Sequence, residues 1–203
     1  MTLGAAALIC FVATAGAANA DILYPSVGKP NVTTYEFTAT ATGDVIAYFA
    51  GSGAGYLEEV GMLVNGIDTG VRGLNDHTSH VGDSVNLGSV HAGDTLTFLD
   101  DVSSIKTTWY SNSALNGDGG NHVYSAPAAA GVTYAGSPAG VYVAFEDLRF
   151  PNSDFNYHDD TFVFTNTSVA GAPEPSTWAM MGLGFAGLGF AGFRGRRSAT
   201  SAA

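Results

Sequence analysis

Short runs of alternating apolar and polar residues, separated by Gly- and Asn-rich turns, occupy most of the chain between residues 33 and 165. Runs of this length that are rich in β-branched and aromatic residues predict strands, and no stretch among them has a helical period. The pattern therefore predicts an all-β fold, an antiparallel β-sandwich or jelly roll. The expected strands are 33–40, 44–49, 57–64, 67–71, 84–90, 95–99, 107–110, 141–145 and 161–165, with a short one near 123–124 in a loop-rich stretch over 112–140.

Three turns indicate how neighbouring strands connect. Asn65-Gly66 is a strong hairpin signal and predicts that 57–64 pairs with 67–71. Thr42-Gly43 separates the first two predicted strands, which we expect to form a hairpin as well. A tight turn is expected at His91–Asp94, before the strand that begins at Thr95.

The N-terminal end differs in composition from the rest of the chain. Residues 1–20 are small and apolar and end in Ala18-Asn19-Ala20, which predicts a secretory signal peptide with an A-x-A cleavage site. Its removal would take away Cys10, the only cysteine of the chain. We therefore expect a mature protein without disulfides and without thiol chemistry.

The C-terminal end carries a second apolar stretch, predicted to be a short transmembrane helix over 178–193. Its flanks suit a membrane interface on one side and the cytoplasm on the other, because Trp favours the interface and Arg stays inside. These flanking residues are Trp178, Arg194, Arg196 and Arg197, and Pro173-Glu174-Pro175 precede them. Residues 167–172 are expected to be a linker, and 198–203 a disordered tail.

This order of tripeptide, apolar run and arginines resembles the PEP-CTERM sorting tail over its whole length, 173–197. Exported proteins of exopolysaccharide-producing Gram-negative bacteria carry that tail as substrates of the transpeptidase exosortase. The resemblance implies a chain that is exported through the inner membrane and anchored there until exosortase processes it. The product would then reside at the cell surface or outside the cell.

Residues 21–166 are expected to form a single domain, long enough to bury a core without disulfides. They contain all of the 18 acidic residues except Glu174, whereas only Lys29, Arg72, Lys106 and Arg149 are basic there. The whole chain has a net charge of −11. Such a surface repels nucleic acid and anionic lipid, and it suits cations or solubility outside the cell.

Acidic residues are densest between the last two predicted strands, over 145–160. Alternating oxygen side chains in a turn can converge on one hard cation, and Ca²⁺ takes about 6 to 8 oxygen ligands. Asp160 adds one more carboxylate to the segment. The alternative is a solvated loop in which Asp and Asn serve turn geometry. The candidate ligands are Glu146, Asp147, Asp154, Asn156, His158 and Asp159.

This segment resembles the "FEDL…D-x-D-Y-N-D" ending of a calcium-associated domain found in many exported bacterial proteins. The match is close over 141–166 and looser over 95–166. It places Glu146, Asp147, Asp154 and Asp159 at the acidic positions of that domain and implies a bound Ca²⁺. Asn156 stands where Asp is usual and His158 where Asn is usual. The loss of one negative charge should lower the Ca²⁺ affinity.

Other side chains suggest rival sites. His77 and His80 lie between Asp76 and Asp83 and could bind zinc, although zinc needs a third or fourth ligand. Although core packing explains Trp109 and Tyr110 equally well, a platform for stacking on sugar rings could come from four aromatic residues. These are Trp109, Tyr110, Tyr124 and Tyr134.

Two functions remain open from the sequence. The first is a non-enzymatic surface or matrix protein, delivered to exopolysaccharide or biofilm, with a Ca²⁺-stabilised sandwich. The second is a carbohydrate-binding or carbohydrate-active domain, in which paired acids could hydrolyse a glycan. Because the acids crowd one loop and do not come from separate strands across a cleft, the sequence favours the first.

Overall fold

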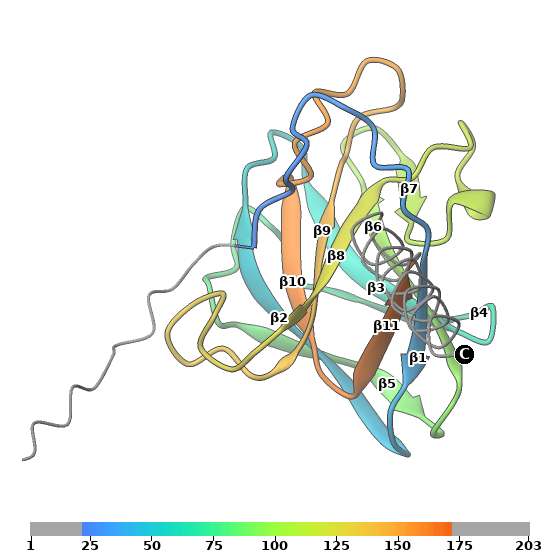
Figure 1. Cartoon of the computed structure of the whole chain (residues 1–203), viewed down its shortest axis with the longest axis vertical. Helices are drawn as coiled ribbons and strands as arrows, with labels where there is room; N and C mark the ends of the chain where they lie inside the picture. Colours follow the sequence, from blue (N-terminus) through green and yellow to red (C-terminus); the bar gives the residue numbers. More distant parts are fainter. Residues whose placement is uncertain (1–21, 172–203) are drawn as a thin grey trace, which may run out of the picture.

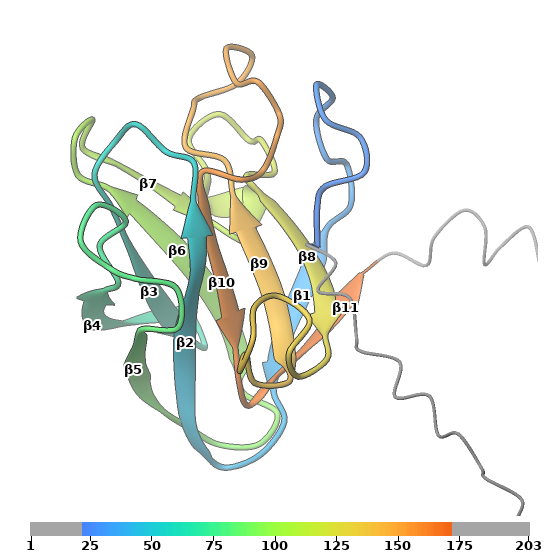
Figure 2. The same cartoon turned by 90° about the vertical axis from the view of Figure 1, so that its left-hand side faces the viewer.

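The computed structural model describes residues 22–171, which form two antiparallel β-sheets packed face to face (Figures 1 and 2). The all-β prediction is confirmed. Within residues 22–171 the only helical element is a single 3₁₀ turn, η1, at Ser113–Leu115.

The first sheet has the strand order β11-β1-β6-β3-β4, and β7 also pairs with β6. Its strands are β1 (Tyr35–Ala39), β3 (Glu58–Val64), β4 (Ile67–Gly73), β6 (Thr95–Val102), β7 (Thr107–Tyr110) and β11 (Thr167–Gly171).

The second sheet has the order β5-β2-β10-β9-β8. Its strands are β2 (Gly43–Ser52), β5 (Ser84–Val90), β8 (Val123–Ala128), β9 (Gly140–Phe145) and β10 (Asp160–Phe164).

The predicted hairpin at Asn65-Gly66 is confirmed. Strands β3 and β4 pair antiparallel, with Val64 opposite Ile67, and both turn residues have positive φ, as a type I′ turn requires. The turn at His91–Asp94 is also present, where the Asp94 amide donates to the His91 carbonyl at 3.0 Å.

Two local predictions were wrong. Strands β1 and β2 do not form a hairpin, because the chain passes from one sheet to the other between Ala39 and Gly43. The expected linker at 167–172 is a strand over Thr167–Gly171, which pairs with β1 along its whole length. Its sequence, Thr-Ser-Val-Ala-Gly, does not alternate between apolar and polar residues as a half-buried strand does, so the sequence pattern did not reveal it.

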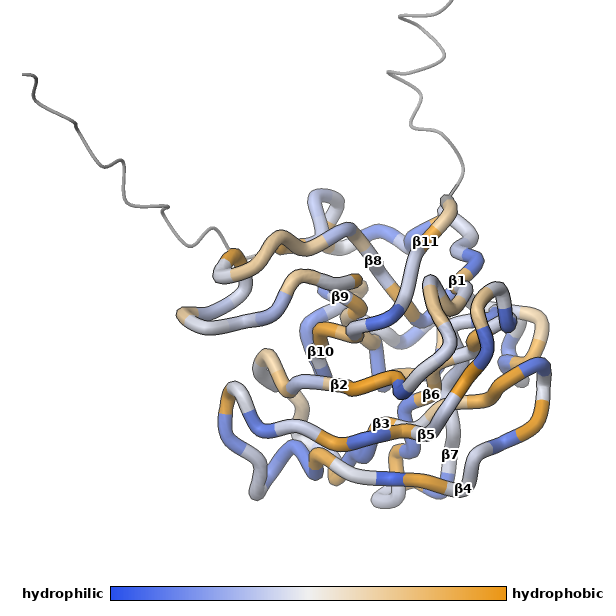
Figure 3. The backbone as a smooth tube through the Cα atoms, turned by 90° about the horizontal axis from the view of Figure 1, so that it is seen from below, coloured by the Kyte–Doolittle hydropathy of each residue, from blue (hydrophilic) through white to orange (hydrophobic). Residues whose placement is uncertain are grey.

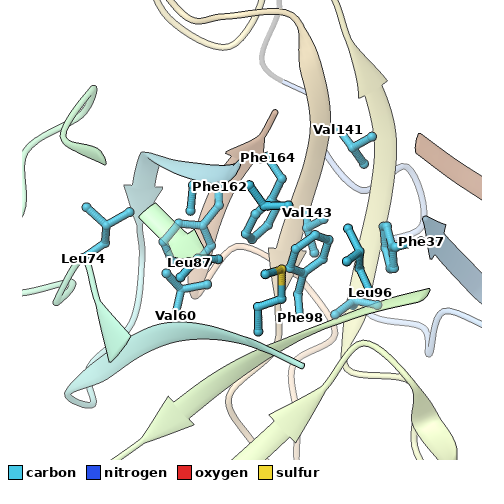
Figure 4. Packing of buried hydrophobic residues seen from close by; sticks show 14 of the residues in the cluster. Phe37, Val60, Leu74, Leu87, Leu96, Phe98, Val141, Val143, Phe162 and Phe164 are labelled. Carbon is cyan, nitrogen blue, oxygen red and sulfur yellow. The ribbon is translucent and has the colours of Figure 1, made fainter. Parts of the chain in front are cut away.

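The hydrophobic core lies between the sheets and is built from rows of inward-facing residues (Figure 4). Phe98 of β6 stacks on Phe164 of β10, with ring centroids 3.7 Å apart. Phe37 of β1 meets Phe98 edge to face at 5.1 Å. Because these rings come from both sheets, their packing holds the sheets together.

The sandwich is also closed along its two lateral edges. Edge strands β8 and β11 lie close together, as Figure 3 shows, and β4 lies beside β5 on the opposite edge. The outer face of β9 and β10 is covered by a second apolar cluster that includes Tyr24 and Tyr157. Strand β10 is consequently buried on both faces.

Several predictions fall outside the described residues. These are the signal peptide (1–20), the sorting tail (173–197) with its transmembrane helix (178–193), and the terminal segment 198–203. In the part of the chain that the structure describes, no helix is long and apolar enough to cross a membrane.

Candidate metal centre

Three inward-facing rows of core residues end in an acid at the same end of the sandwich. In β10 the row is Asp160, Phe162 and Phe164, where the two rings belong to the core. The row of β6 runs from Leu96 and Phe98 to Asp100. Since side chains alternate across a strand, each acid faces the space between the sheets, as its apolar neighbours do.

Strand β3 supplies the third acid in the same way. Its inward row begins at Glu58 and continues through Val60 and Met62. Val60 pairs directly with Asp100, so Glu58 lies diagonally beside Asp100 on one face of the first sheet. Asp160 approaches both acids from the second sheet.

We call Glu58, Asp100 and Asp160 the inner triad. Each of the three residues is 0% exposed, and one carboxylate oxygen from each lies within 4.8 Å of the others. In the described chain neither carboxylate oxygen of any of them has a hydrogen-bond partner. The sequence pattern did not identify Glu58 or Asp100 as ligands, and Asp160 was expected only to add a charge to the predicted site.

A second group, the outer triad, consists of Glu146, Asp147 and Asp159, and again its ligand atoms lie within 4.8 Å of one another. Glu146 and Asp147 directly follow β9, and Asp159 directly precedes β10, so pairing of these strands brings the acids together. The loop that joins the strands lies at the top of Figures 1 and 2. Hence three of the six predicted ligands meet in one place.

The outer triad is buried almost as deeply as the inner one, since Asp147 is 4% and Asp159 8% exposed. Glu146 is 0% exposed, and within residues 22–171 neither of its carboxylate oxygens has a hydrogen-bond partner. Asp159 accepts a hydrogen bond from the Asp147 amide on Oδ2, at 3.0 Å, which leaves Oδ1 for a ligand.

The other three predicted ligands are placed differently. Asp154 is exposed and accepts hydrogen bonds from the amide and the side-chain Nδ2 of Asn156. The Asn156 side-chain oxygen in turn accepts from the His158 amide at 2.7 Å. Asn156 and His158 therefore shape the loop and lie outside both triads. Asp154 also lies outside them, but its charge contributes to raising the pKa of Glu146.

Buried aromatic rings fix the backbone that carries the outer triad. Trp109 Nε1 donates to the Asp147 carbonyl at 2.6 Å, and His122 Nδ1 donates to the Glu146 carbonyl at 2.7 Å. The Trp109 and His122 rings stack in parallel with centroids 3.7 Å apart, and Phe150 covers the other face of His122. These contacts orient the carbonyls so that the acid side chains turn inward.

A charged partner holds His122 in this orientation. Its Nε2 lies 3.1 Å from Asp118 Oδ2, and both side chains are almost fully buried. Burial would raise the pKa of Asp118, but hydrogen bonds donated by the Gly120 and Phe150 amides and by His122 outweigh it and lower that pKa. Asp118 therefore stays ionised and ties the loop to β8 through His122.

Burial dominates the electrostatics of both triads. It is the first cause that raises the pKa of Glu58 to about 12, followed by the charges of Asp100 and Asp160. Burial likewise raises the pKa of Asp159 to about 8, with the Glu146 charge next. The remaining carboxyls of the two triads shift in the same direction for the same first reason. Without a counter-charge these acids therefore resist ionisation.

No basic side chain among residues 22–171 supplies that counter-charge. Among residues 22–171, no ion pair includes a member of either triad. A buried carboxylate without a partner is costly, so such groups are normally protonated, paired or bound to a metal. The donors are all carboxylate oxygens, which suit hard cations such as Ca²⁺ and not the softer metals that prefer nitrogen or sulfur.

In the described chain, the two histidines and Trp109 do not take the positions that the rival sites need. His77 lies near Asp76 and His80 near Asp83, and in residues 22–171 neither histidine belongs to a cluster of three ligands. Trp109 is only 3% exposed and packs against His122, so it offers no face to a sugar. A hollow of about 400 Å³ lies beside β1 and η1, and no triad residue lines it.

Comparison of the chain with protein-family models, with curated proteins and with solved structures found no match.

Proposed function

We propose that this chain is an exported, non-enzymatic protein of the cell surface or extracellular matrix whose β-sandwich is stabilised by Ca²⁺ bound at the outer triad. One observation carries the metal site. The Glu146 carboxylate is fully buried, has no hydrogen-bond partner among residues 22–171, and lies beside two further acids. A divalent cation would supply the charge and the ligand bonds that these oxygens need.

The destination follows from the two ends of the chain. The signal peptide would export it through the inner membrane, and the PEP-CTERM tail would anchor it until exosortase acts, in an exopolysaccharide-producing Gram-negative bacterium. The non-enzymatic part of the proposal is supported by the depth of the acids, which face the interior and do not line the hollow described above.

Thermal unfolding of the full chain in Ca²⁺, Mg²⁺ and chelator tests the metal site. At a Ca²⁺ concentration about 100-fold above the dissociation constant, binding adds about 2.7 kcal/mol, which should raise the melting temperature by roughly 5 to 10 °C. Mg²⁺ should do much less, because it needs near-ideal octahedral geometry and gives up water reluctantly. Equal melting in Ca²⁺ and chelator would refute the proposed site.

Matched variants identify the ligands. Glu146→Gln keeps the size of the side chain and removes its charge, so it should abolish most of the Ca²⁺-dependent shift. Glu36→Gln makes the same change at an exposed position of β1 and should leave the shift intact.

Expression with and without exosortase tests the sorting. Processing should change the mass of the protein and release it from the membrane fraction. An identical mass and an identical distribution in both strains would remove the sorting part of the proposal while leaving the metal site untouched.

A further inference from the structure

The inner triad needs a counter-charge as much as the outer one does. No contact in the described chain supplies it. Glu58, Asp100 and Asp160 are completely buried, and none of their six carboxylate oxygens has a hydrogen-bond partner within residues 22–171. The three ligand atoms lie within 4.8 Å of one another, a spacing that one Ca²⁺ can bridge with ligand distances of about 2.3 to 2.6 Å.

The two triads are neighbours, and Asp147 lies where they meet. Asp147 interacts electrostatically with Glu58, and after burial its charge is the first cause that raises the pKa of Asp100. Asp159 of the outer triad acts on Asp100 and Asp160 as well. Asp147 thus belongs to the outer triad and also acts on two acids of the inner triad, as expected for a ligand shared between two cations.

A single divalent cation would leave most of the charge of this region uncompensated. The two triads together contain six carboxyl groups, and Asp76 lies next to them with a side chain that is 1% exposed. The Asp76 carboxylate accepts a hydrogen bond from the Glu58 amide at 2.8 Å on Oδ1 and acts electrostatically on Asp100 and Asp160. Two divalent cations would balance four of these charges, and the bridging carboxylate would screen the cations from each other.

We infer that the chain binds a second Ca²⁺-like cation at Glu58, Asp100 and Asp160, and that Asp147 bridges it to the cation of the outer triad. This inference rests on the proposed outer site. Because Glu58 and Asp100 belong to one sheet and Asp160 to the other, the inner cation ties the two sheets directly together. The outer cation, in contrast, joins the ends of β9 and β10 and the loop between them.

The stoichiometry of Ca²⁺ binding tests this inference. Equilibrium dialysis of the full chain against Ca²⁺ alone, or native mass spectrometry, should find two ions per wild-type chain. Glu58→Gln and Asp100→Asn should each retain one ion. Glu59→Gln removes the same charge from the next residue of β3, which is partly exposed and lies on the other face, and should still bind two.

The Asp147→Asn variant tests whether Asp147 bridges both ions or binds only one of them. Loss of an outer partner of a metal ligand commonly costs about 10- to 100-fold in affinity. Loss of a bridging ligand should weaken both ions by at least that much, whereas Glu146→Gln should weaken mainly the outer one. An effect of Asp147→Asn on one ion alone would refute the bridge.

The wild-type result is decisive even if an inner-triad variant fails to fold. A single bound ion would overturn the inner site and leave the proposed function standing, whereas no bound ion would overturn both. Luminescence energy transfer between Eu³⁺ and Tb³⁺ loaded together gives an independent measurement on the unaltered chain. Efficient transfer is expected for two adjacent sites, and its absence would contradict them.

Discussion

The space between the two sheets is filled in two ways. Along most of its length aromatic and aliphatic side chains pack against one another, whereas at one end the same strands place carboxylates there. Strand β10 contains both regions, since Phe162 and Phe164 belong to the core and Asp160 to the inner triad. The apolar part stabilises the fold under all conditions, because burial of apolar surface needs no ligand. The acidic part stabilises it only when its charge is balanced.

The largest expected effect concerns the apolar part. Phe98→Ala removes a fully buried ring that stacks on Phe164 and should lower the free energy of unfolding by about 3 to 5 kcal/mol. The loss should be the same in Ca²⁺ and in chelator, as measured by urea unfolding. Ile67→Ala, at a side chain that is 75% exposed, should change stability by no more than about 0.5 kcal/mol. A Ca²⁺-dependent effect of Phe98→Ala would contradict the division between the two regions.

The second-largest effect, that of Asp100→Asn on stability, should depend on whether Ca²⁺ is present. In saturating Ca²⁺, Asp100→Asn should cost about 2 to 3 kcal/mol, because one bound cation is lost. In chelator the same substitution removes a buried, repelled carboxyl and should leave stability unchanged or raise it. Glu59→Gln is the control and should be neutral in both solutions. A loss of equal size in Ca²⁺ and in chelator would mean that Asp100 has only a structural role.

The third prediction concerns pH in the absence of cations. The pKa of Asp159 is raised in the fold to about 8 from an ordinary value of 3.8, so the folded state binds the proton more tightly than the unfolded state. Its contribution to stability is complete below about pH 4 and disappears as the pH rises through about 8. The loss is at most about 1.4 kcal/mol per pH unit for each such group.

Thermal melts in chelator from pH 5 to 8 measure this loss, and Asp159→Asn should flatten the curve. Ca²⁺ should reverse the trend, since it binds the ionised carboxylates. A cation-free chain whose stability rises over this range would show that the acids are ionised and paired by other means.

The smallest effect should come from the residues that hold the outer triad in place. Trp109→Phe keeps a ring against His122 but removes the hydrogen bond to the Asp147 carbonyl, at a cost of about 1 kcal/mol. The Ca²⁺ affinity, measured by calorimetric titration, should fall with it. Tyr110→Phe, at the neighbouring half-buried position, is the control. An unchanged affinity in Trp109→Phe would mean that the loop holds its shape without that bond.

Local signals in the sequence predicted much of the fold, and the six ligands expected from them include all three acids of the outer triad. Asn65-Gly66 identified its hairpin because a type I′ turn depends only on the two turn residues. Asp154, Asn156 and His158 lie outside the outer triad, because alternation in an irregular loop does not determine which side chains turn inward. The pairing of β9 with β10 decided that.

The inner triad was missed for a different reason, although a signal was present. Glu58 precedes Val60 and Met62 at the spacing of one strand face, and Asp160 stands in the same relation to Phe162 and Phe164. An acid in phase with an inward row is the expected signature of a buried charge. Which other acids surround such a residue depends on the neighbouring strands, and these lie far away in the sequence.

By itself the sequence determined that the body of the chain is all-β and acidic, because alternation, turn residues and charge are local properties. The residues at its two ends also predict export and sorting signals. Only the tertiary structure decided that the two sheets bring Glu58, Asp100 and Asp160 together next to the outer triad. The physical reason is that a buried carboxylate is defined by what surrounds it, and strand order and register between distant segments set those surroundings.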